Sequence, residues 1–299
     1  MIKKIIKNRY FYYGLFLGLT FVLLLFPTTT LFSQKISQNI FTHPLQPVVS
    51  RNSPLQLSTN YYILLDVSTN KILVSSRENE RIYPASTTKL ATALTALNVY
   101  PLNEVITVTQ EYNDGKTMEL KKDEKITIKN LVAGLLIYSA NDAAYNLATQ
   151  YSQGQVAFID QMNSLMQKYG LKNTHFTNFD GLHDPNHYST VYDLAQLGRV
   201  AIQNSTLKNF VKEKELVLTD VSGQISHHII STNELLGIVP EIEGLKTGWT
   251  PDARGSFIGL INLRGHYLIS VVAQSEDRFA DTKILVDWAK NNITWRNYQ

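Results

Sequence analysis

The chain has 299 residues, of which 44% are hydrophobic and 18% are charged, so it can bury a sizeable core and is not a disordered protein. It contains no cysteine, which excludes a disulfide framework, a thiol nucleophile and metal sites with thiolate ligands. Four of the 28 basic side chains stand in the first ten residues, and the other 24 are balanced by 25 acidic ones, which indicates no nucleic-acid partner.

An uncharged stretch follows this basic start and runs from Tyr10 to Gln34. A positive flank before an apolar run is typical of a signal peptide or a signal anchor, and this run is long enough to span a bilayer. No small-x-small cleavage site occurs at residues 28–33, so the pattern favours an uncleaved anchor over residues 1–34. We therefore expect the remaining chain to be extracytoplasmic, held at the cell membrane, or secreted if the segment is cleaved.

Residues 35–57 are polar, contain prolines and show no clear period, which predicts a linker. One domain is predicted over residues 58–291, followed by a tail at 292–299. Two β-rich runs at 61–67 and 71–75 predict a hairpin, and helical periodicity begins near Pro84. The predicted helices cover 84–99, 131–136, 143–148 and 156–169, one begins at Asp193, and the last covers 277–290; the late strands cover 244–248, 256–262 and 266–273.

Strands therefore stand at both ends of the domain, and helices lie between them. This order predicts a mixed α/β (α+β) fold, with one antiparallel sheet built from both ends and a mostly helical insertion beside it.

The first motif with chemical potential is Ser86-Thr87-Thr88-Lys89, at the start of the first predicted helix. Because residues i and i+3 share a helix face, the Lys89 amine can reach the Ser86 hydroxyl, which needs a base to become a nucleophile. Burial and a second cation, for which Lys246 is the candidate, would lower the pKa of Lys89 from about 10.4 to near 7. Backbone N–H groups at the helix start could hold an oxyanion. The alternative is an ordinary helix-capping serine beside a solvated lysine.

Two further motifs follow in order along the chain. Ser139-Ala140-Asn141 lies between two predicted helices, where an extended loop would point the Ser139 and Asn141 side chains the same way. Ser139 could then relay a proton, and Asn141 could hold Lys89 and a substrate amide. Lys246-Thr247-Gly248 lies on a predicted strand, where Gly248 would allow a peptide ligand to approach closely and the other two could bind a carboxylate. The alternatives are a helix cap and an ordinary strand that ends at a glycine turn.

Together these motifs resemble those of the penicillin-recognising serine acyl-transferases, and most closely the low-molecular-mass penicillin-binding proteins, the D-alanyl-D-alanine carboxypeptidases. The likeness covers about residues 58 to 290. Besides the three motifs, it rests on the segments 83–89, 117–120, 131–142, 179–183, 187–195 and 244–250.

This resemblance implies a β-lactamase/penicillin-binding-protein transpeptidase-like fold and a catalytic domain at 58–291. It implies roles for nine residues: Ser86 as acyl-ester nucleophile, Lys89 as general base, Ser139 and Asn141 as relay and positioning groups, Lys246, Thr247 and Gly248 as substrate binders, the N–H groups of Ser86 and Trp249 as an oxyanion hole, and Arg278 as a partner of the terminal carboxylate. It implies no cofactor and no metal.

The sequence departs from the resembled family in two respects. Trp249 stands where some members carry His, and the separate C-terminal β-rich domain with its amphipathic tail anchor is missing. Anchoring would then fall to the N-terminal segment.

Three alternatives remain open at the sequence level. A class A β-lactamase would need a glutamate to direct the deacylating water, and residues 181–187 contain none. A non-catalytic wall-binding relative would be expected to lose Ser86 or Lys89, and both are present. His183 and His187 are the only hint of a metal site, and they lack the H-E-x-x-H pattern. No G-x-S-x-G motif occurs, which argues against an α/β-hydrolase triad.

The sequence thus predicts a membrane-anchored, extracytoplasmic serine D-Ala-D-Ala carboxypeptidase that acts on peptidoglycan stem peptides and is trapped by β-lactams.

Overall fold

The computed structural model describes residues 45–50 and 54–297, and these described residues belong to one compact unit. The predicted anchor at 1–34 lies outside the described residues. Within the described ranges, no helix is long and apolar enough to cross a membrane.

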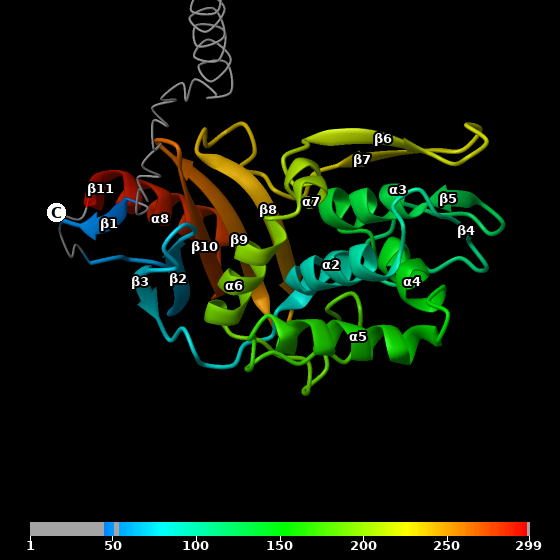
Figure 1. Ribbon diagram of the computed structural model, residues 1–299, viewed down its shortest axis with the longest axis horizontal. Helices are drawn as coiled ribbons and strands as arrows, with labels where there is room; N and C mark the ends of the chain where they lie inside the picture. Colours follow the sequence, from blue (N-terminus) through cyan, green and yellow to red (C-terminus); the bar gives the residue numbers. More distant parts are fainter. Residues whose placement is uncertain (1–44, 51–53, 298–299) are drawn as a thin grey trace, which may run out of the picture. The chain divides into compact units, whose positions relative to one another are not determined.

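A five-stranded antiparallel sheet forms the centre of this unit, with the strand order β3-β2-β10-β9-β8 (Figure 1). Its strands are β2 (Tyr61–Asp66), β3 (Ile72–Ser76), β8 (Ile242–Thr250), β9 (Arg254–Leu263) and β10 (His266–Ser275). Because β2 pairs with β10, the sheet joins the two ends of the domain, which confirms the predicted fold class. Strand β8 is an edge strand, paired on one side by β9.

Successive residues of a strand point to opposite faces of the sheet, and here the apolar side chains on both faces are buried. Ile63, Ile258 and Val271 belong to one apolar cluster, whereas their neighbours Leu64 and Phe257 belong to a second. Helix α6 (Val191–Ala201) packs on the sheet at the first cluster, and α8 (Arg278–Asn292) contributes Leu285 and Trp288 to the second. The late strands therefore read as nearly continuous apolar runs.

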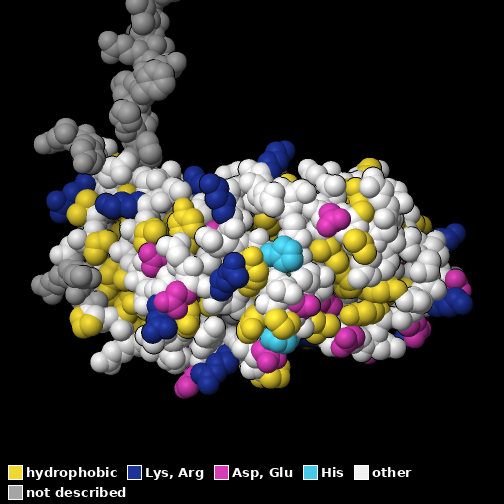
Figure 2. Space-filling model, turned by 90° about the horizontal axis from the view of Figure 1, so that it is seen from below, with side chains coloured by type: hydrophobic (Ala, Val, Ile, Leu, Met, Phe, Trp, Pro, Cys, Tyr) yellow, Lys and Arg dark blue, Asp and Glu magenta, His cyan; other side chains and the backbone are white. Residues whose placement is uncertain are grey.

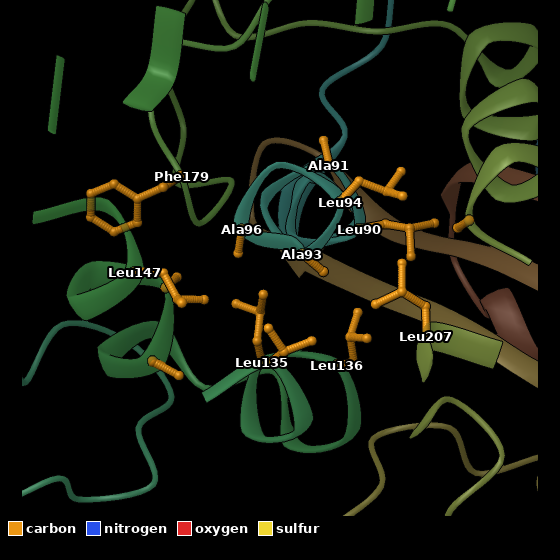
Figure 3. Packing of buried hydrophobic residues seen from close by; sticks show 14 of the residues in the cluster. Leu90, Ala91, Ala93, Leu94, Ala96, Leu135, Leu136, Leu147, Phe179 and Leu207 are labelled. Atoms are coloured by element: carbon orange, nitrogen blue, oxygen red, sulfur yellow. The ribbon is translucent and has the colours of Figure 1, made fainter. Parts of the chain in front are cut away.

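The helical insertion is built around α2 (Lys89–Val99), which follows the short 3₁₀ turn η1 (Ala85–Thr88). Figure 3 shows its apolar side chains between those of neighbouring elements, with Leu90, Ala93 and Ala96 facing Leu135 and Leu136. The surrounding helices are α3 (Ile128–Ala133), the π-helical turn η2 (Gly134–Tyr138), α4 (Asn141–Thr149), α5 (Gly154–Lys168) and α7 (Ser205–Phe210).

Three small antiparallel pairs were not predicted. Strand β1 (Gln46–Val49) pairs with β11 (Ile293–Arg296), so the segments predicted as linker and tail each contain a strand. Strand β4 (Val105–Thr107) pairs with β5 (Lys125–Thr127), and β6 (Glu215–Thr219) pairs with β7 (Ser226–Ile230). The β6–β7 hairpin could have been found from its sequence pattern. Leu218 in β6 and Ile229 in β7 are buried between exposed neighbours, and Gly223 lies in the turn between the two strands.

Figure 2 shows one face of the domain, on which basic and acidic side chains are interspersed with apolar and neutral ones. This face therefore presents no extended patch of a single charge.

Candidate active site

The predicted nucleophile and base are in direct contact. Lys89 Nζ donates a hydrogen bond to Ser86 Oγ at 2.8 Å and another to the backbone oxygen of Asp180 at 2.7 Å. The turn that carries Ser86 begins at Ala85, which has a left-handed φ of 49°, and it is tied by the Thr87 hydroxyl, which donates to Pro84 O at 2.6 Å. A non-glycine residue in this backbone region stores strain, which is common beside reactive groups.

Lys89 is fully buried, and burial lowers the pKa of its amine from 10.5 to about 8, while the Asp180 carboxylate opposes this shift. The neutral amine that a general base requires is therefore accessible near neutral pH.

Asp180 was not predicted as a site residue. It lies in a tight segment where Gly181 has a φ of 88° and a Cβ there would stand 1.9 Å from the backbone oxygen of Ala85. Asn178 supports the segment, accepting from Gly181 N at 2.8 Å and donating to Leu182 O at 2.9 Å. A glycine is thus required for this segment to reach the nucleophile turn. The segment was recognised through the family resemblance, but a contact through a backbone carbonyl has no signature in residue identity.

The Ser-Ala-Asn motif lies between η2 and α4, and both polar side chains are buried. The predicted extended loop is wrong in detail, because Ser139 is left-handed at φ 67° and ψ 33°, and Asn141 already opens α4. The Asn141 amide does not hold Lys89 as expected; it donates to the backbone oxygen of Asp114 at 2.9 Å. Among the described residues, no side chain forms a hydrogen bond with the Ser139 hydroxyl.

The Lys-Thr-Gly motif lies on edge strand β8, directly against the nucleophile turn. A Cβ at Gly248 would stand 3.0 Å from Pro84 O and 3.1 Å from Ser86 N, so this close packing depends on glycine. Thr247 Oγ1 hydrogen-bonds to Thr232 Oγ1 at 2.6 Å. The structure thus brings the first and third motifs together, as predicted.

Lys246 is the second buried lysine of the candidate site. Lys246 is buried, donates to Thr247 O at 3.0 Å, and has a pKa well below its usual range, because of burial first and then the charges of Lys89, Lys116 and Arg278. The sequence predicts Lys246 as the second cation that lowers the pKa of Lys89. Burial is the main cause of the lowered Lys89 pKa, and repulsion between the two amines disfavours the state in which both are charged.

The last two predicted residues lie at the end of the same strand. Trp249 is 61% exposed and pairs with Gly255 of the neighbouring strand β9. Gly255 in turn lies close to Arg278, because a Cβ at Gly255 would stand 3.3 Å from the Arg278 Cβ. Arg278 opens α8, and its Nε is buried without a hydrogen-bond partner. A buried guanidinium N–H with no partner is suited to bind a carboxylate.

The two histidines that hinted at a metal site have other partners. His187 is buried and accepts from Thr177 N through Nδ1 at 3.1 Å, so its Nε2 carries the proton that is donated to Thr88 Oγ1 at 2.8 Å. Burial lowers the pKa of His187 to about 3, which keeps the ring neutral. His183 lies 3.7 Å from a carboxylate oxygen of Asp252. In the described part of the chain, no group of three or more His, Cys, Asp or Glu residues could hold a metal ion.

Comparison with known proteins gives a consistent family. A family model described as D-alanyl-D-alanine carboxypeptidase matches residues 48–277. The chain is 28% identical over 249 residues to the D-alanyl-D-alanine carboxypeptidase DacF of Bacillus subtilis (strain 168), covering 80% of this chain and 64% of that protein. It is 32% identical over 225 residues to a D-alanyl-D-alanine carboxypeptidase of Streptomyces sp. (strain K15), covering 69% and 77% respectively. The chain thus spans less than two thirds of the length of the Bacillus relative.

Solved structures agree with this result. The Streptomyces K15 DD-transpeptidase superposes with a TM-score of 0.75 at 28% identity, covering 79% of this chain and 98% of that chain. A D-alanyl-D-alanine carboxypeptidase from Mycobacterium tuberculosis H37Rv gives a TM-score of 0.76 at 27% identity and covers 84% and 99%.

Proposed function

Because the chain belongs to the D-alanyl-D-alanine carboxypeptidase family, we propose that it is a serine D-Ala-D-Ala carboxypeptidase that acts on peptidoglycan stem peptides and is acylated by β-lactams. The observation that carries this proposal is the 2.8 Å hydrogen bond from the buried Lys89 amine to the Ser86 hydroxyl, beside a glycine of an edge strand. A Ser–Lys pair of this kind needs no histidine to generate a nucleophile.

In the proposed acylation step, neutral Lys89 accepts the proton of Ser86 Oγ while that oxygen attacks the carbonyl carbon of the penultimate D-Ala. The N–H groups of Ser86 and Trp249 stabilise the oxyanion. A substrate strand that adds to the free edge of β8 would bring its carbonyl to this position, since β8 packs against the Ser86 turn.

The terminal D-Ala leaves as an amine, which takes a proton through Ser139 as the C–N bond breaks and the Ser86 ester remains. Asn141 positions the substrate amide. Lys246, Thr247 and Arg278 bind the terminal carboxylate, a role supported by the buried, unpartnered Arg278 Nε. Water then hydrolyses the ester and restores the Ser86 hydroxyl. Recognition of a terminal carboxylate would make the enzyme an exopeptidase.

The N-terminal segment remains part of the proposal. Residues 1–34 would anchor the catalytic domain at the outer surface of the cell membrane, and the domain would be released if the segment is cleaved.

Covalent labelling with a fluorescent penicillin, followed by intact mass and an assay of D-Ala release from a D-Ala-D-Ala peptide, tests this function. We expect Ser86→Ala to abolish both labelling and release. Ser205→Ala, which changes an exposed serine at the start of α7, should retain both. Labelling that persists in Ser86→Ala would remove Ser86 from its role.

Lys89→Arg gives a second test, because a guanidinium cannot become neutral and serve as a base. This variant should fold and lose acylation; normal acylation would contradict the assignment of Lys89. Rapid repeated turnover of a chromogenic cephalosporin would favour a β-lactamase instead.

A further inference from the structure

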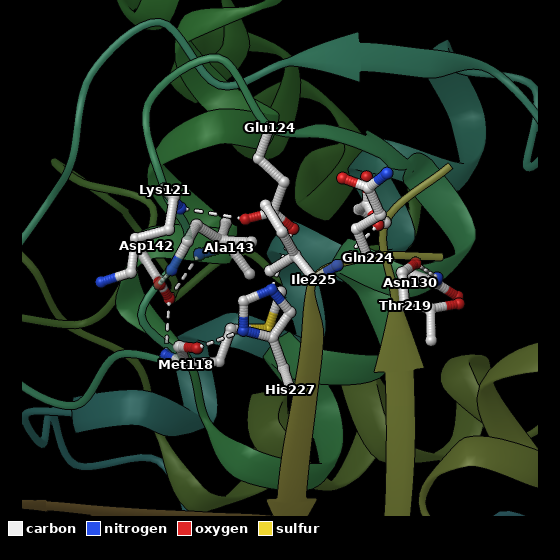
Figure 4. A network of polar contacts seen from close by, with 12 residues as sticks. Met118, Lys121, Glu124, Asn130, Asp142, Ala143, Thr219, Gln224, Ile225 and His227 are labelled. Carbon is white, nitrogen blue, oxygen red and sulfur yellow. Dashed lines mark hydrogen bonds and ion pairs between the residues drawn. The ribbon is translucent and has the colours of Figure 1, made fainter. Parts of the chain in front are cut away.

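The segment between β4 and β5 is fixed to the part of the site that carries the Ser-Ala-Asn motif. The Asp142 carboxylate accepts from Met118 N at 3.1 Å, and His227 of β7 donates through Nδ1 to Met118 O at 2.7 Å (Figure 4). Closer to β4, the Asn141 amide donates to the backbone oxygen of Asp114 at 2.9 Å. The segment is therefore held against the first turn of α4 at two places.

Tyr112 lies in this segment and packs among aromatic rings from two other elements. Its ring stacks on that of Tyr145 in α4, with the ring centres 4.6 Å apart, and meets the ring of Phe179 edge-on at 6.4 Å. The Tyr145 hydroxyl in turn accepts a hydrogen bond from the side-chain amide of Gln110. These contacts restrict the Tyr112 side chain, so that its hydroxyl has a defined direction.

The Tyr112 hydroxyl contacts the residue that lies against both reactive groups. It donates to Asp180 Oδ2 at 3.2 Å, while Oδ1 of the same carboxylate accepts from Leu182 N at 3.1 Å. The backbone oxygen of Asp180 lies 2.7 Å from Lys89 Nζ and 3.5 Å from Ser86 Oγ. Burial, and then the Asp180 charge, raise the pKa of Tyr112, so the phenol keeps the proton that it donates.

The direction of the Asp180 carboxylate matters for the base. A carboxylate in contact with a lysine favours the charged amine, which cannot accept a proton. Asp180 is buried, so water screens its charge little, yet it meets the Lys89 amine through its neutral carbonyl. The other titratable groups near Lys89 are Lys246 of β8, which repels it, and His187, whose lowered pKa keeps the ring neutral. The position of this one carboxylate therefore affects how readily Lys89 loses its proton.

We propose that Tyr112 is a positioning residue that holds the Asp180 carboxylate away from the Lys89 amine and so keeps that amine available as a neutral base. The inference rests on the proposed function, in which neutral Lys89 activates Ser86. Tyr112 acts through Asp180, with which it forms its hydrogen bond, and the Leu182 N–H holds the other carboxylate oxygen.

Tyr112→Phe tests the proposal, because it keeps the ring contacts and removes only the hydroxyl. The rate of penicillin labelling of the full chain is measured between pH 6 and 9.5. The released carboxylate should raise the midpoint of this profile by about half a pH unit, so that acylation at pH 7 falls about threefold. Tyr169→Phe, which removes the hydroxyl of an exposed tyrosine at the end of α5, should leave the profile unchanged.

The double variant Tyr112→Phe/Asp180→Asn shows whether the hydroxyl acts through the carboxylate. Without a charge at residue 180, loss of the hydroxyl should leave the midpoint where Asp180→Asn alone places it. The inference is wrong if Tyr112→Phe lowers the rate equally at every pH or leaves the midpoint unmoved, or if it causes the same upward shift in the Asp180→Asn background. An unaltered chain that penicillin does not label at any pH would instead overturn the proposed function.

Discussion

The ionisation of Lys89 gives a direct prediction for the pH dependence of acylation. With a pKa of about 8, roughly 10% of the amine is neutral at pH 7, against well under 0.1% for a lysine of ordinary pKa. The shift from 10.5 corresponds to about 3 kcal/mol against the charged form, and burial of the amine is its main cause. Because the neutral amine is the base, acylation should rise about tenfold per pH unit below 8 and level off above it.

Asp180→Asn perturbs this ionisation without removing the backbone oxygen that Lys89 contacts. The Asp180 carboxylate raises the pKa of Lys89, so its loss should move the pH midpoint below that of the unaltered enzyme and increase acylation at pH 7. An asparagine can still accept from Leu182 N and interact with the Tyr112 hydroxyl, which the carboxylate does at 3.1 and 3.2 Å.

The assay is the second-order rate constant for labelling by a fluorescent penicillin between pH 6 and 9.5. Asp123→Asn is the matched control, since it makes the same charge change at an exposed position that does not contribute to the Lys89 shift. A flat profile in the unaltered chain, or a midpoint that moves upward in Asp180→Asn, would refute the role of Lys89 as the titrating base.

Two further predictions concern the elements that support the site. Gly181→Ala should destabilise the fold by at least about 1 kcal/mol and reduce acylation, because the new Cβ would meet the Ala85 carbonyl. Gly223 also has a positive φ, but a Cβ there would meet no atom within 4 Å, so Gly223→Ala should leave acylation unchanged. Thermal melting measures the stability of both variants, and penicillin labelling measures their acylation. His227→Ala should cost about 3 kcal/mol in urea unfolding at pH 6, because it leaves the Glu124 carboxylate buried without its partner, and an effect as small as that of the exposed His228→Ala would contradict this. Since the pKa of His227 is raised on folding, its contribution is complete below pH about 6.5 and is lost as pH rises through the raised value.

The sheet could be predicted because its strands are apolar on both faces and are separated by turn residues. Arg264 and Gly265 both have positive φ in the β9–β10 connection, as a tight hairpin requires, and the predicted strands fall within β9 and β10. The β1–β11 pair was missed for a physical reason: it joins residues 46–49 to 293–296, and short segments this far apart have no local pattern that indicates pairing.

In the site, the contact between the Ser86 and Lys89 side chains was predictable, and the backbone geometry was not. Residue types at helical spacing placed Lys89 beside Ser86, and the structure has that contact at 2.8 Å. The left-handed conformation of Ser139 and the carbonyl of Asp180 depend on how η2 ends and on how the Gly181 segment packs. These are tertiary effects, which a reading by residue type and period does not capture.

The two buried lysines link substrate binding to base catalysis in the proposed mechanism. Burial is the main cause of the lowered pKa of Lys246, and the charges of Lys89, Lys116 and Arg278 lower it further, whereas the Asp180 carboxylate opposes the lowering of the Lys89 pKa. In the free enzyme Lys246 therefore loses its proton more readily than an ordinary lysine. A substrate carboxylate bound beside Lys246 would favour its charged form, and that charge would in turn favour neutral Lys89. The second cation expected from the sequence would then act when substrate is bound, which couples recognition of the terminal carboxylate to activation of Ser86.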